Sequence, residues 1–425
     1  MKNINIGLFG FGCVGQGLYE TLNNSRNFAG EISKICIKNA DKKRKLPNQL
    51  FTTSKEEIIN DEAIDIVVEL IDDADAALSI VVTSLKAGKS VVTANKKMVA
   101  ENLEYLVELQ QQTGKAVLYE GAVCGSIPII RTLEEYFGHE PLNEIKGIFN
   151  GSTNYILTKV FEERLDYPKV LKEAQELGFA ETDPTLDVQG FDPKFKLSIL
   201  LTHAFGIHVP PSHITNLGID RLKTADLEYA RANGHTIKLV AQAKRIGEKV
   251  FGFVIPQFIQ PDHTLANIQN EFNAVTINGE FCDEQLFIGK GAGSLPTGAA
   301  VLSDISALSY DYKYEYKKHY NLGKLPFSNQ SPIQVYVSYN SPEQVDLSDF
   351  ESIQEKYFSF DHCYIIGNIC IGKLQKAEWR NNQNINIVLT PEGCQKGLGN
   401  LCVSDLKEEI SELKKGQKIR ERITI

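Results

Sequence analysis

Several features are missing from this sequence, and each absence excludes a class of protein. No run approaches the ~20 consecutive apolar residues of a membrane-spanning helix. Lysine and arginine number 45 against 54 aspartates and glutamates, so the basic surplus of a nucleic-acid-binding protein is lacking. The start, MKNINIGLFGFG, has no long apolar signal core. We therefore expect a cytoplasmic protein that binds a small molecule rather than a membrane or nucleic acid.

The cysteines lack any pattern. No two of the eight form a C-x-x-C pair, so the sequence predicts neither a zinc site nor a disulfide framework. With no export signal, we expect buried or idle thiols of a cytoplasmic protein. They stand at Cys13, Cys36, Cys124, Cys282, Cys363, Cys370, Cys394 and Cys402.

The first third of the chain alternates short apolar runs with helical patterns. The strand-like runs are nearly continuous apolar stretches, as in a parallel sheet covered on both faces. We predict a Rossmann-type, doubly wound α/β domain for nucleotide binding over residues 1–130. The expected strands are 3–10, 31–38, 65–71, 90–94 and 116–121, and the expected helices include 78–88 and 102–114.

The remaining 295 residues of the 425 predict two further units. Residues 131–324, with helical patterns at 166–178 and 195–206 and strands near 250–290, predict an α+β domain. Residues 325–425 predict a small ferredoxin-like module of order β-α-β-β-α-β. Its expected strands are 333–339, 363–375, 385–390 and 418–425, and its expected helices are 347–358 and 403–416.

A glycine loop follows the first expected strand. Gly10, Gly12 and Gly15 form a G-x-G-x-x-G that opens a helix, with Phe11, Cys13 and Val14 between them. Such glycines allow a tight turn and close approach of the backbone to a pyrophosphate at the helix N-terminus. We predict a dinucleotide site here rather than a structural turn.

The second expected strand ends without the acidic residue that usually binds the ribose of NAD. Lys38 and Asn39 stand there instead, followed by Lys42, Lys43 and Arg44. Cations suit a 2′-phosphate, so NADP is favoured, with NAD possible and a solvated basic loop as the alternative.

Two lysines follow structural elements where chemistry is plausible. VVTANKKM places Lys96 just after an apolar strand, at the edge of the sheet where open α/β folds bind ligands. In AETDPTLDVQGFDPKFKL (180–197), Asp192 is a predicted N-cap, which puts Lys196 in the first turn of a helix. The helix dipole disfavours a charged lysine there, whereas the nearby carboxylates favour it.

This balance of charges favours acid–base chemistry. We predict that Lys196 is the general acid for a carbonyl oxygen, tuned by Asp187 and Asp192, and that Glu181 receives the ammonium of an amino-acid substrate. An acidic loop capping a helix would explain Asp192 but not a lysine at this position. Asn150 is interpreted as a helix cap, and His203, His208 and His213 as structural residues.

Residues 1 to about 310 resemble the homoserine dehydrogenase family. The resemblance rests on GFGCVG, VVTANK, YEGAVCGSIPIIRTL, GIFNGSTNYIL, EAQELGFAETDPTLDVQGFDPKFKLSIL and GKGAGSLPTGAAVLSDI, in that order and at the family's spacing. It implies an NAD(P)-dependent oxidoreductase that interconverts L-homoserine and L-aspartate 4-semialdehyde in threonine, methionine and isoleucine biosynthesis. It also implies that 131–324 is a catalytic and dimerisation domain, with 289–310 returning to the cofactor domain, in a homodimer or homotetramer.

The resemblance also assigns roles. Lys196 matches the proton-donating lysine and Lys96 the lysine between cofactor and substrate, while Glu181, Asp187 and Asp192 match acids that hold substrate and lysine. Gly291 and Gly293 match a late glycine loop at the cofactor. A loop that binds sodium or another monovalent cation through main-chain carbonyls is matched by Glu120, Val123, Gly125 and Ile127.

The chain departs from the family at a few positions. Asp72 and Asp73 replace glycines in ELIDDAD, Ser126 replaces a glycine and Lys290 a proline. The C-terminal module has the predicted order of an ACT-type regulatory domain, but its first turn, YNSPEQVD, lacks the ligand-binding glycine, so threonine binding is not predicted.

Two other functions remain open. One is a different NADP oxidoreductase for an amino-acid aldehyde, which would lack the acidic–lysine block. The other is a catalytically silent nucleotide-binding regulator, against which the presence of both lysines speaks.

Overall fold

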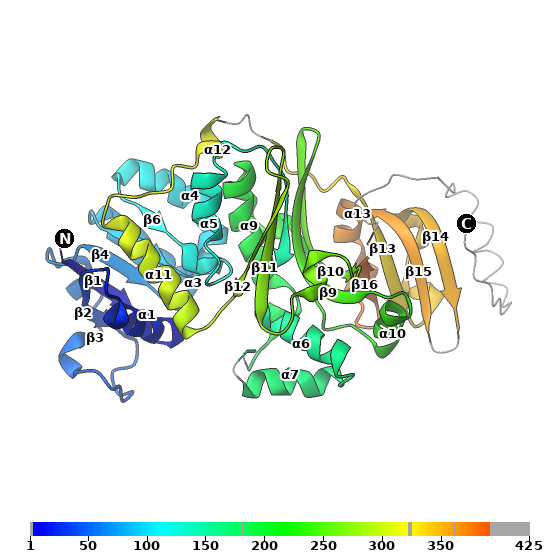
Figure 1. Ribbon diagram of the computed structural model, residues 1–425, viewed down its shortest axis with the longest axis horizontal. Helices are drawn as coiled ribbons and strands as arrows, with labels where there is room; N and C mark the ends of the chain where they lie inside the picture. Colours follow the sequence, from blue (N-terminus) through cyan, green and yellow to red (C-terminus); the bar gives the residue numbers. More distant parts are fainter. Residues whose placement is uncertain (1–2, 178, 181, 322–324, 360–361, 392–425) are drawn as a thin grey trace.

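The computed structural model describes residues 3–391 except 178, 181, 322–324 and 360–361. Its first unit is a six-stranded parallel sheet of order β3-β2-β1-β4-β5-β6, as predicted for a doubly wound domain. The strands alternate with helices that cover the sheet (Figure 1). The strands are β1 (Ile4–Phe9), β2 (Gly30–Cys36), β3 (Phe51–Thr52), β4 (Ile66–Glu69), β5 (Ser90–Thr93) and β6 (Val117–Leu118). The helices are α1 (Cys13–Asn24), α2 (Glu56–Ile59), α3 (Ala74–Lys86) and α4 (Lys96–Thr113).

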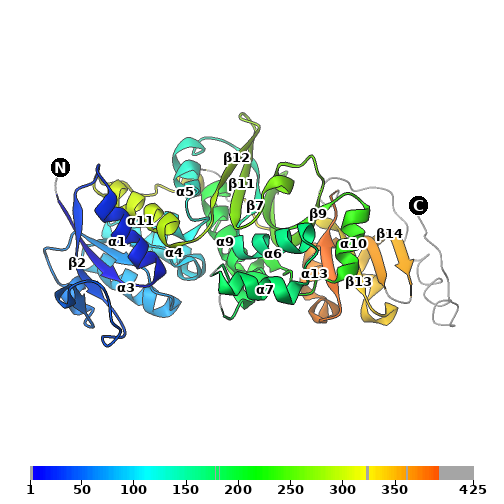
Figure 2. The ribbon, with the colours of Figure 1, turned by 60° about the horizontal axis from the view of Figure 1, so that its bottom comes forward.

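A late segment returns to this first unit. Helix α11 (Ser294–Leu308) packs along α1, as Figures 1 and 2 both show. The two helices approach so closely that a Cβ on Gly17 would lie 1.9 Å from the carbonyl oxygen of Ser294, and one on Gly298 would lie 2.5 Å from the carbonyl carbon of Gly17. Only glycine fits such a crossing.

The middle unit is built on antiparallel strands in the order β12-β11-β7-β9-β10. The long helix α9 lies between this sheet and the first unit, in contact with both α4 and β9. The strands are β7 (Leu142–Ile148), β8 (Thr215–Asn216), β9 (Thr236–Ile246), β10 (Lys249–Ile259), β11 (Phe272–Gly279) and β12 (Glu284–Lys290). The helices are α5 (Ile129–Arg131), α6 (Gly151–Glu162), α7 (Tyr167–Glu176), α8 (Thr185–Val188), α9 (Phe191–Phe205), α10 (Thr224–Ala232) and α12 (Lys317–Asn321).

The C-terminal unit continues the middle sheet. Strand β16 pairs with β10 through a single residue pair, Gln257 with Leu389, and the order then runs β16-β13-β15-β14. Figure 2 shows the units following one another along the molecule. The elements are β13 (Pro332–Tyr339), β14 (Phe350–Phe358), β15 (Cys363–Cys370), α13 (Ile371–Lys376), the 3-10 helix η8 (Glu378–Asn381) and β16 (Asn386–Leu389).

Part of the predicted C-terminal order was wrong. Residues 347–358, predicted as a helix, form a short 3-10 turn and then strand β14, while 363–375, predicted as one strand, divides into β15 and α13. The predicted helix 403–416 and strand 418–425 lie outside the described residues. The β-α-β-β-α-β order is therefore not what the described part of this unit has.

Two further expectations concern the whole chain. In the part that the structure describes, no helix is both long and apolar enough to cross a membrane. The six cysteines that lie there are free thiols, of which Cys124, Cys363 and Cys370 are buried. The prediction of thiols without disulfide pairing is confirmed for these six.

Candidate active site

Two lysines far apart in the sequence share one buried carboxylate. The Nζ atom of Lys96 lies 2.5 Å from Oδ1 of Asp192, and the Nζ atom of Lys196 lies 2.8 Å from Oδ2. Lys196 Nζ also donates to the main-chain oxygen of Phe149 at 2.7 Å. The predicted convergence of the two amines is thus present in the fold.

The local sequence explains how both lysines reach this point. Lys96 is the first residue of α4, directly after β5, and Asn95 caps that helix by accepting from Met98 N at 3.0 Å. Helix α9 starts at Phe191 and is preceded by Gly190 in the left-handed region, at φ +78°. A turn of that kind favours glycine and reverses the chain into the helix.

The prediction that Asp192 caps α9 was wrong. Gly190 occupies the cap, so Asp192 lies one residue inside the helix, and its carboxylate accepts from Lys196 and Asn150. The contacts with two ammonium groups and one amide account for the orientation of the side chain.

Asn150 bridges two acids. Its amide nitrogen donates to Asp187 at 2.7 Å and to Asp192 at 2.8 Å, while its oxygen accepts from Thr153 N at 2.8 Å as the cap of α6. The predicted capping role is confirmed, but the sequence did not reveal the bridge. The only signal was a polar cap residue directly after a strand that ends near the same edge.

The charges at this site divide the two acids. Burial disfavours an ionised Asp192, but the ammonium groups of Lys196 and Lys96 outweigh it and hold the pKa of Asp192 well below its usual range. Burial, and then the neighbouring charge of Asp192, raise the pKa of Asp187. Asp192 is therefore a fixed anion, whereas Asp187 takes up a proton more readily.

The two amines differ in access. The side chain of Lys196 is 7% exposed, whereas that of Lys96 is 41% exposed. A molecule that approaches from solvent would therefore meet Lys96 before Lys196. Glu181, the predicted ammonium-binding residue, lies outside the described residues.

The glycine loop leaves space in front of a helix end. Gly12 precedes α1, no side chain caps that end, and a Cβ built on Gly12 would meet nothing within 4 Å. By contrast, a Cβ on Gly15 would lie 2.5 Å from the oxygen of Gly10. Free backbone amides with open space before them fit a phosphate group. The Phe11 ring turns away to pack on Phe51, with centroids 5.7 Å apart.

Arg44, in the basic run after β2, lies beside this loop. Lys38 is exposed just past the strand, and the guanidinium of Arg44 lies 5.1 Å from the ring centroid of Phe51. Because Phe51 also contacts Phe11, Arg44 stands next to the glycine loop rather than on a remote surface.

The late glycine loop joins the same region. Ser294 Oγ donates to the oxygen of Cys13 at 2.8 Å, so the start of α11 touches the first glycine loop. On its other side, Ser126 N donates to the oxygen of Lys290 at 3.0 Å, and a Cβ on Gly125 would lie 2.6 Å from that same oxygen. Gly291 and Gly293 therefore connect the glycine loop to the loop that was predicted to bind a cation.

The residues of that predicted cation loop form a tight turn. Cys124 and Gly125 both have left-handed backbone angles, at φ 54° and 55°. The oxygen of Glu120 accepts from Val123 N at 3.2 Å and that of Ile127 from Ile129 N at 2.8 Å. A carbonyl oxygen has a second lone pair, so these bonds are compatible with a cation. Among the described residues no three His, Cys, Asp or Glu side chains gather as metal ligands.

A buried acid, Glu69, lies at the end of β4, the strand that pairs with the β5 strand before Lys96. Glu69, the last residue of β4, accepts from Thr93 Oγ1 and from Ile71 N, both at 2.6 Å. Burial raises the pKa of Glu69 to about 7. The side chain holds the turn after β4, where Asp73 accepts from Ala76 N at 2.9 Å and caps α3.

Two of the three histidines that were interpreted as structural, His203 and His208, make hydrogen bonds inside the fold. His203 is buried, with Nδ1 2.6 Å from Glu134 Oε1 and Nε2 2.9 Å from the hydroxyl of Tyr119. His208 Nδ1 lies 3.0 Å from the hydroxyl of Thr202. These contacts use both ring nitrogens of His203 and Nδ1 of His208.

Comparisons with known proteins agree on one family. Residues 10–120 match the family model described as "Homoserine dehydrogenase, NAD binding domain", and residues 128–306 match that of "Homoserine dehydrogenase". The homoserine dehydrogenase of Bacillus subtilis is 38% identical over 317 residues, which cover 72% of this chain and 73% of the relative. That of Helicobacter pylori is 31% identical over 365 residues, covering 84% and 81%.

Solved structures extend the likeness. A homoserine dehydrogenase from Thiobacillus denitrificans aligns with a TM-score of 0.80 at 30% identity, over 92% of this chain and 98% of that one. A hyperthermophilic archaeal homoserine dehydrogenase mutant in complex with NADPH aligns with a TM-score of 0.62 at 25% identity, over 74% of this chain and all of that one.

Proposed function

The chain belongs to the homoserine dehydrogenase family, and from that premise we propose that it interconverts L-homoserine and L-aspartate 4-semialdehyde, as an oxidoreductase that acts on a CH–OH group with a nicotinamide cofactor. The observation that carries this proposal is the sharing of buried Asp192 by Lys96 and Lys196. A nucleotide-binding regulator without activity would have no need to keep two ammonium groups together at the edge of its cofactor sheet.

The glycine loop, Gly10 to Gly15, would hold the cofactor pyrophosphate at the N-terminus of α1, and Gly291 and Gly293 would close over it. When bound, the nicotinamide would be the donor or acceptor of the hydride at the substrate carbon. Every other step depends on side chains of this chain.

The lysines would handle charge and proton. In the reductive direction Lys196 donates a proton to the developing alkoxide, and Lys96 stabilises the same oxygen from the open side. Asp192 keeps both amines in place, as its contacts of 2.5 and 2.8 Å allow. In the oxidative direction a neutral Lys196 takes the proton, so turnover would rise at alkaline pH.

The acids would bind the amino-acid part. Asp187, held by Asn150, lies next to Asp192, and Glu181 would receive the substrate ammonium. The proposed set is thus Lys96, Lys196 and Asp192 for catalysis, with Glu181, Asp187 and Lys96 for substrate.

For the cofactor we propose a preference for NADP, with NAD as the alternative. Lys38 and Arg44 beside the glycine loop would pair with a 2′-phosphate. We also propose a sodium or other monovalent cation bound through the carbonyls of Glu120, Val123, Gly125 and Ile127, where it would stiffen the contact between this loop and Lys290.

For the architecture we propose cofactor, catalytic and C-terminal units over 1–130, 131–324 and 325–425, in a cytoplasmic homodimer or homotetramer. The strand order β16-β13-β15-β14 matches a ferredoxin-like sheet in which the first crossover has lost its helix. An ACT-like role in assembly fits this unit.

One assay tests these proposals together. Homoserine oxidation is measured with NAD and NADP side by side, in sodium and in tetramethylammonium buffers, with and without threonine. We expect oxidation, a lower KM for NADP, a loss of rate without sodium and no response to threonine. Tight NADPH binding without any homoserine oxidation would contradict the proposed enzymatic activity.

A further inference from the structure

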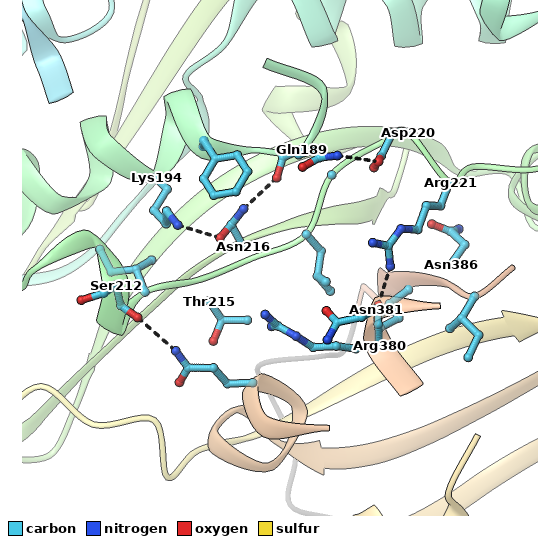
Figure 3. A pocket seen from close by; sticks show the side chains of 17 residues that line it. Gln189, Lys194, Ser212, Thr215, Asn216, Asp220, Arg221, Arg380, Asn381 and Asn386 are labelled. Atoms are coloured by element: carbon cyan, nitrogen blue, oxygen red, sulfur yellow. Dashed lines mark hydrogen bonds between the residues drawn. The ribbon is translucent and has the colours of Figure 1, made fainter. Parts of the chain in front are cut away.

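A polar cavity lies between the middle and C-terminal units, on the side of the α9 start that faces away from Asp192 and Lys196. It has a volume of about 300 Å³, the lower end of the range typical of small-molecule sites. Figure 3 shows side chains reaching it from the α8–α9 turn and β8 above, and from η8 below. Nothing in the proposed reaction uses this space.

Cations dominate the charged groups of this cavity. Lys194, Arg221 and Arg380 line it, against one acid, Asp220, whose carboxylate accepts from Gln189 Nε2 at 3.4 Å. The Nζ of Lys194 donates to a neutral group, Asn216 Oδ1, at 2.9 Å. The charged groups that line the space therefore sum to about +2 by formal charge.

The two guanidinium groups are also incompletely paired. Arg221 Nη1 donates to the main-chain oxygen of Arg380, but Arg221 Nε and Arg380 Nη1 are buried without a hydrogen-bond partner within the described part of the chain. Burial, and then the charge of Arg221, lower the pKa of Arg380. The buried hydroxyl of Thr215, which also lines the cavity, lacks a partner among the described residues too. Buried donors left unpaired cost free energy, which an anion would recover.

We propose that this cavity is a binding site for a small dianion, of the phosphate or dicarboxylate class, which Lys194, Arg221 and Arg380 hold together. Its volume suits a ligand of that size, and its donors are those that oxyanions prefer.

The position of Lys194 connects this ligand to the active site. Lys194 stands two residues from both Asp192 and Lys196 on the first turns of α9. Its partner Asn216 donates in turn to the oxygen of Gln189, at 2.8 Å, in the turn that carries Asp187. A dianion that draws Lys194 into the cavity therefore acts on the segment that orients the proposed catalytic carboxylates. This coupling rests on the proposed function, whereas the binding itself does not.

Binding is tested on the full chain by calorimetric titration with inorganic phosphate and, separately, with malonate, at constant ionic strength set by chloride. We expect saturable binding of at least one of them and at least a tenfold weaker affinity in Arg380→Gln. The matched control is Arg245→Gln, an arginine paired with Glu248 at the β9–β10 hairpin, which should bind as the wild type does. Absence of saturable binding, or equal affinity in Arg380→Gln and wild type, overturns the site.

Coupling is tested by homoserine oxidation with the same anions. We expect at least a twofold change in KM or kcat for the wild type and Arg245→Gln, and none in Arg380→Gln. An anion that binds to the wild type without changing either constant overturns the coupling alone. If the chain oxidises no homoserine, the proposed function fails, and the titration still decides whether the anion site exists.

Discussion

Positively charged side chains lie on both sides of the α9 start, but on one side they are paired with a carboxylate and on the other they face a cavity with few acids. On one side, two ammonium groups share the carboxylate of Asp192 at 2.5 and 2.8 Å. On the other, Lys194 and two arginines face a cavity with one acid that is already bonded to Gln189. Residues 192–196 thus contribute both to a cluster whose lysines contact a carboxylate and to a cavity whose lysine donates to a neutral amide.

The difference shows what a buried charge requires. A carboxylate that is fully paired keeps its neighbours in a fixed geometry, which acid–base chemistry needs. Where cationic side chains outnumber the acids, some of their N–H groups remain available to donate to a ligand. The same helix turn therefore suggests catalysis on one face and recognition on the other, and the following predictions separate the two.

The largest effect is expected from Lys196→Met. Removing the proton donor should lower kcat for homoserine oxidation by roughly 10²–10⁴-fold, the usual contribution of a positioned acid or base. The contacts of Lys196 are with Asp192 and Phe149 and not with the glycine loop. The dissociation constant of NADPH should therefore change less than twofold, as measured by fluorescence titration. Lys97→Met, at the exposed neighbour of Lys96, serves as control and should keep wild-type kcat. Full turnover in Lys196→Met would remove the catalytic assignment.

The N-terminus of α1, behind the glycine loop, also presents partial positive charge to open space. Two alanine variants extend the comparison to this region. Gly12→Ala adds a methyl group that meets nothing within 4 Å in the fold, but it would occupy the space before α1. We expect an unchanged thermal midpoint and at least tenfold weaker NADPH binding. Gly17→Ala, whose methyl would lie 1.9 Å from the oxygen of Ser294, should instead lower the thermal midpoint. Equal nucleotide affinity in Gly12→Ala and wild type would contradict the pyrophosphate site.

Anion binding in the polar cavity should depend on pH through Lys194. Burial, and then the charge of Arg380, lower the pKa of Lys194 to about 8. Arg221 adds to the positive field, while Asp220 and Glu101 oppose it. As the pH rises through about 8, Lys194 loses its proton and should bind an anion less well. Malonate affinity should fall about tenfold between pH 7 and 9, since a charge-assisted hydrogen bond contributes roughly 1.5–3 kcal/mol. A flat profile would exclude Lys194 from the site.

A last prediction concerns Glu69, the buried acid at the end of β4. The pKa of Glu69 is raised from 4.5 to about 7, so its contribution to stability is complete below pH 4.5 and is lost as the pH rises through about 7. Between pH 5 and 8 the wild type should therefore lose about 2–3 kcal/mol relative to Glu69→Gln, which has no such titration. Thermal midpoints of both proteins across this range measure the difference, and parallel curves would contradict it.

The sequence predicted the first unit well because its strands are buried on both faces. Runs such as IVVE in β4, buried at every position, leave little choice of structure. The two-residue strand β3 was missed because so short a segment has no period. Residues 347–358 were taken for a helix because their charged and apolar residues repeat without strict alternation. In the fold this stretch forms an edge strand whose pairing with β15 is interrupted by two register shifts.

The residues of the candidate site and the convergence of its two lysines were predicted from the sequence, whereas its other contacts were not. Lys96, Asp192 and Lys196 were all identified, since each follows a recognisable element boundary. The bridge from Asn150 to both acids depends on the meeting of α6, α8 and α9, which no local pattern encodes. Likewise, the charge of the polar cavity depends on Arg380 and Lys194 lining the same space, although they are nearly two hundred residues apart in the sequence.

The return of α11 to α1 has a consequence for how the protein is made. Helix α1 emerges from the ribosome early, but the surface on which Ser294 and Gly298 rest stays uncovered until almost three hundred residues have been synthesised. The nucleotide-binding unit is thus completed by α11 and not by the first 130 residues alone. A nascent chain released before α11 would carry the glycine loop without the helix that fastens it.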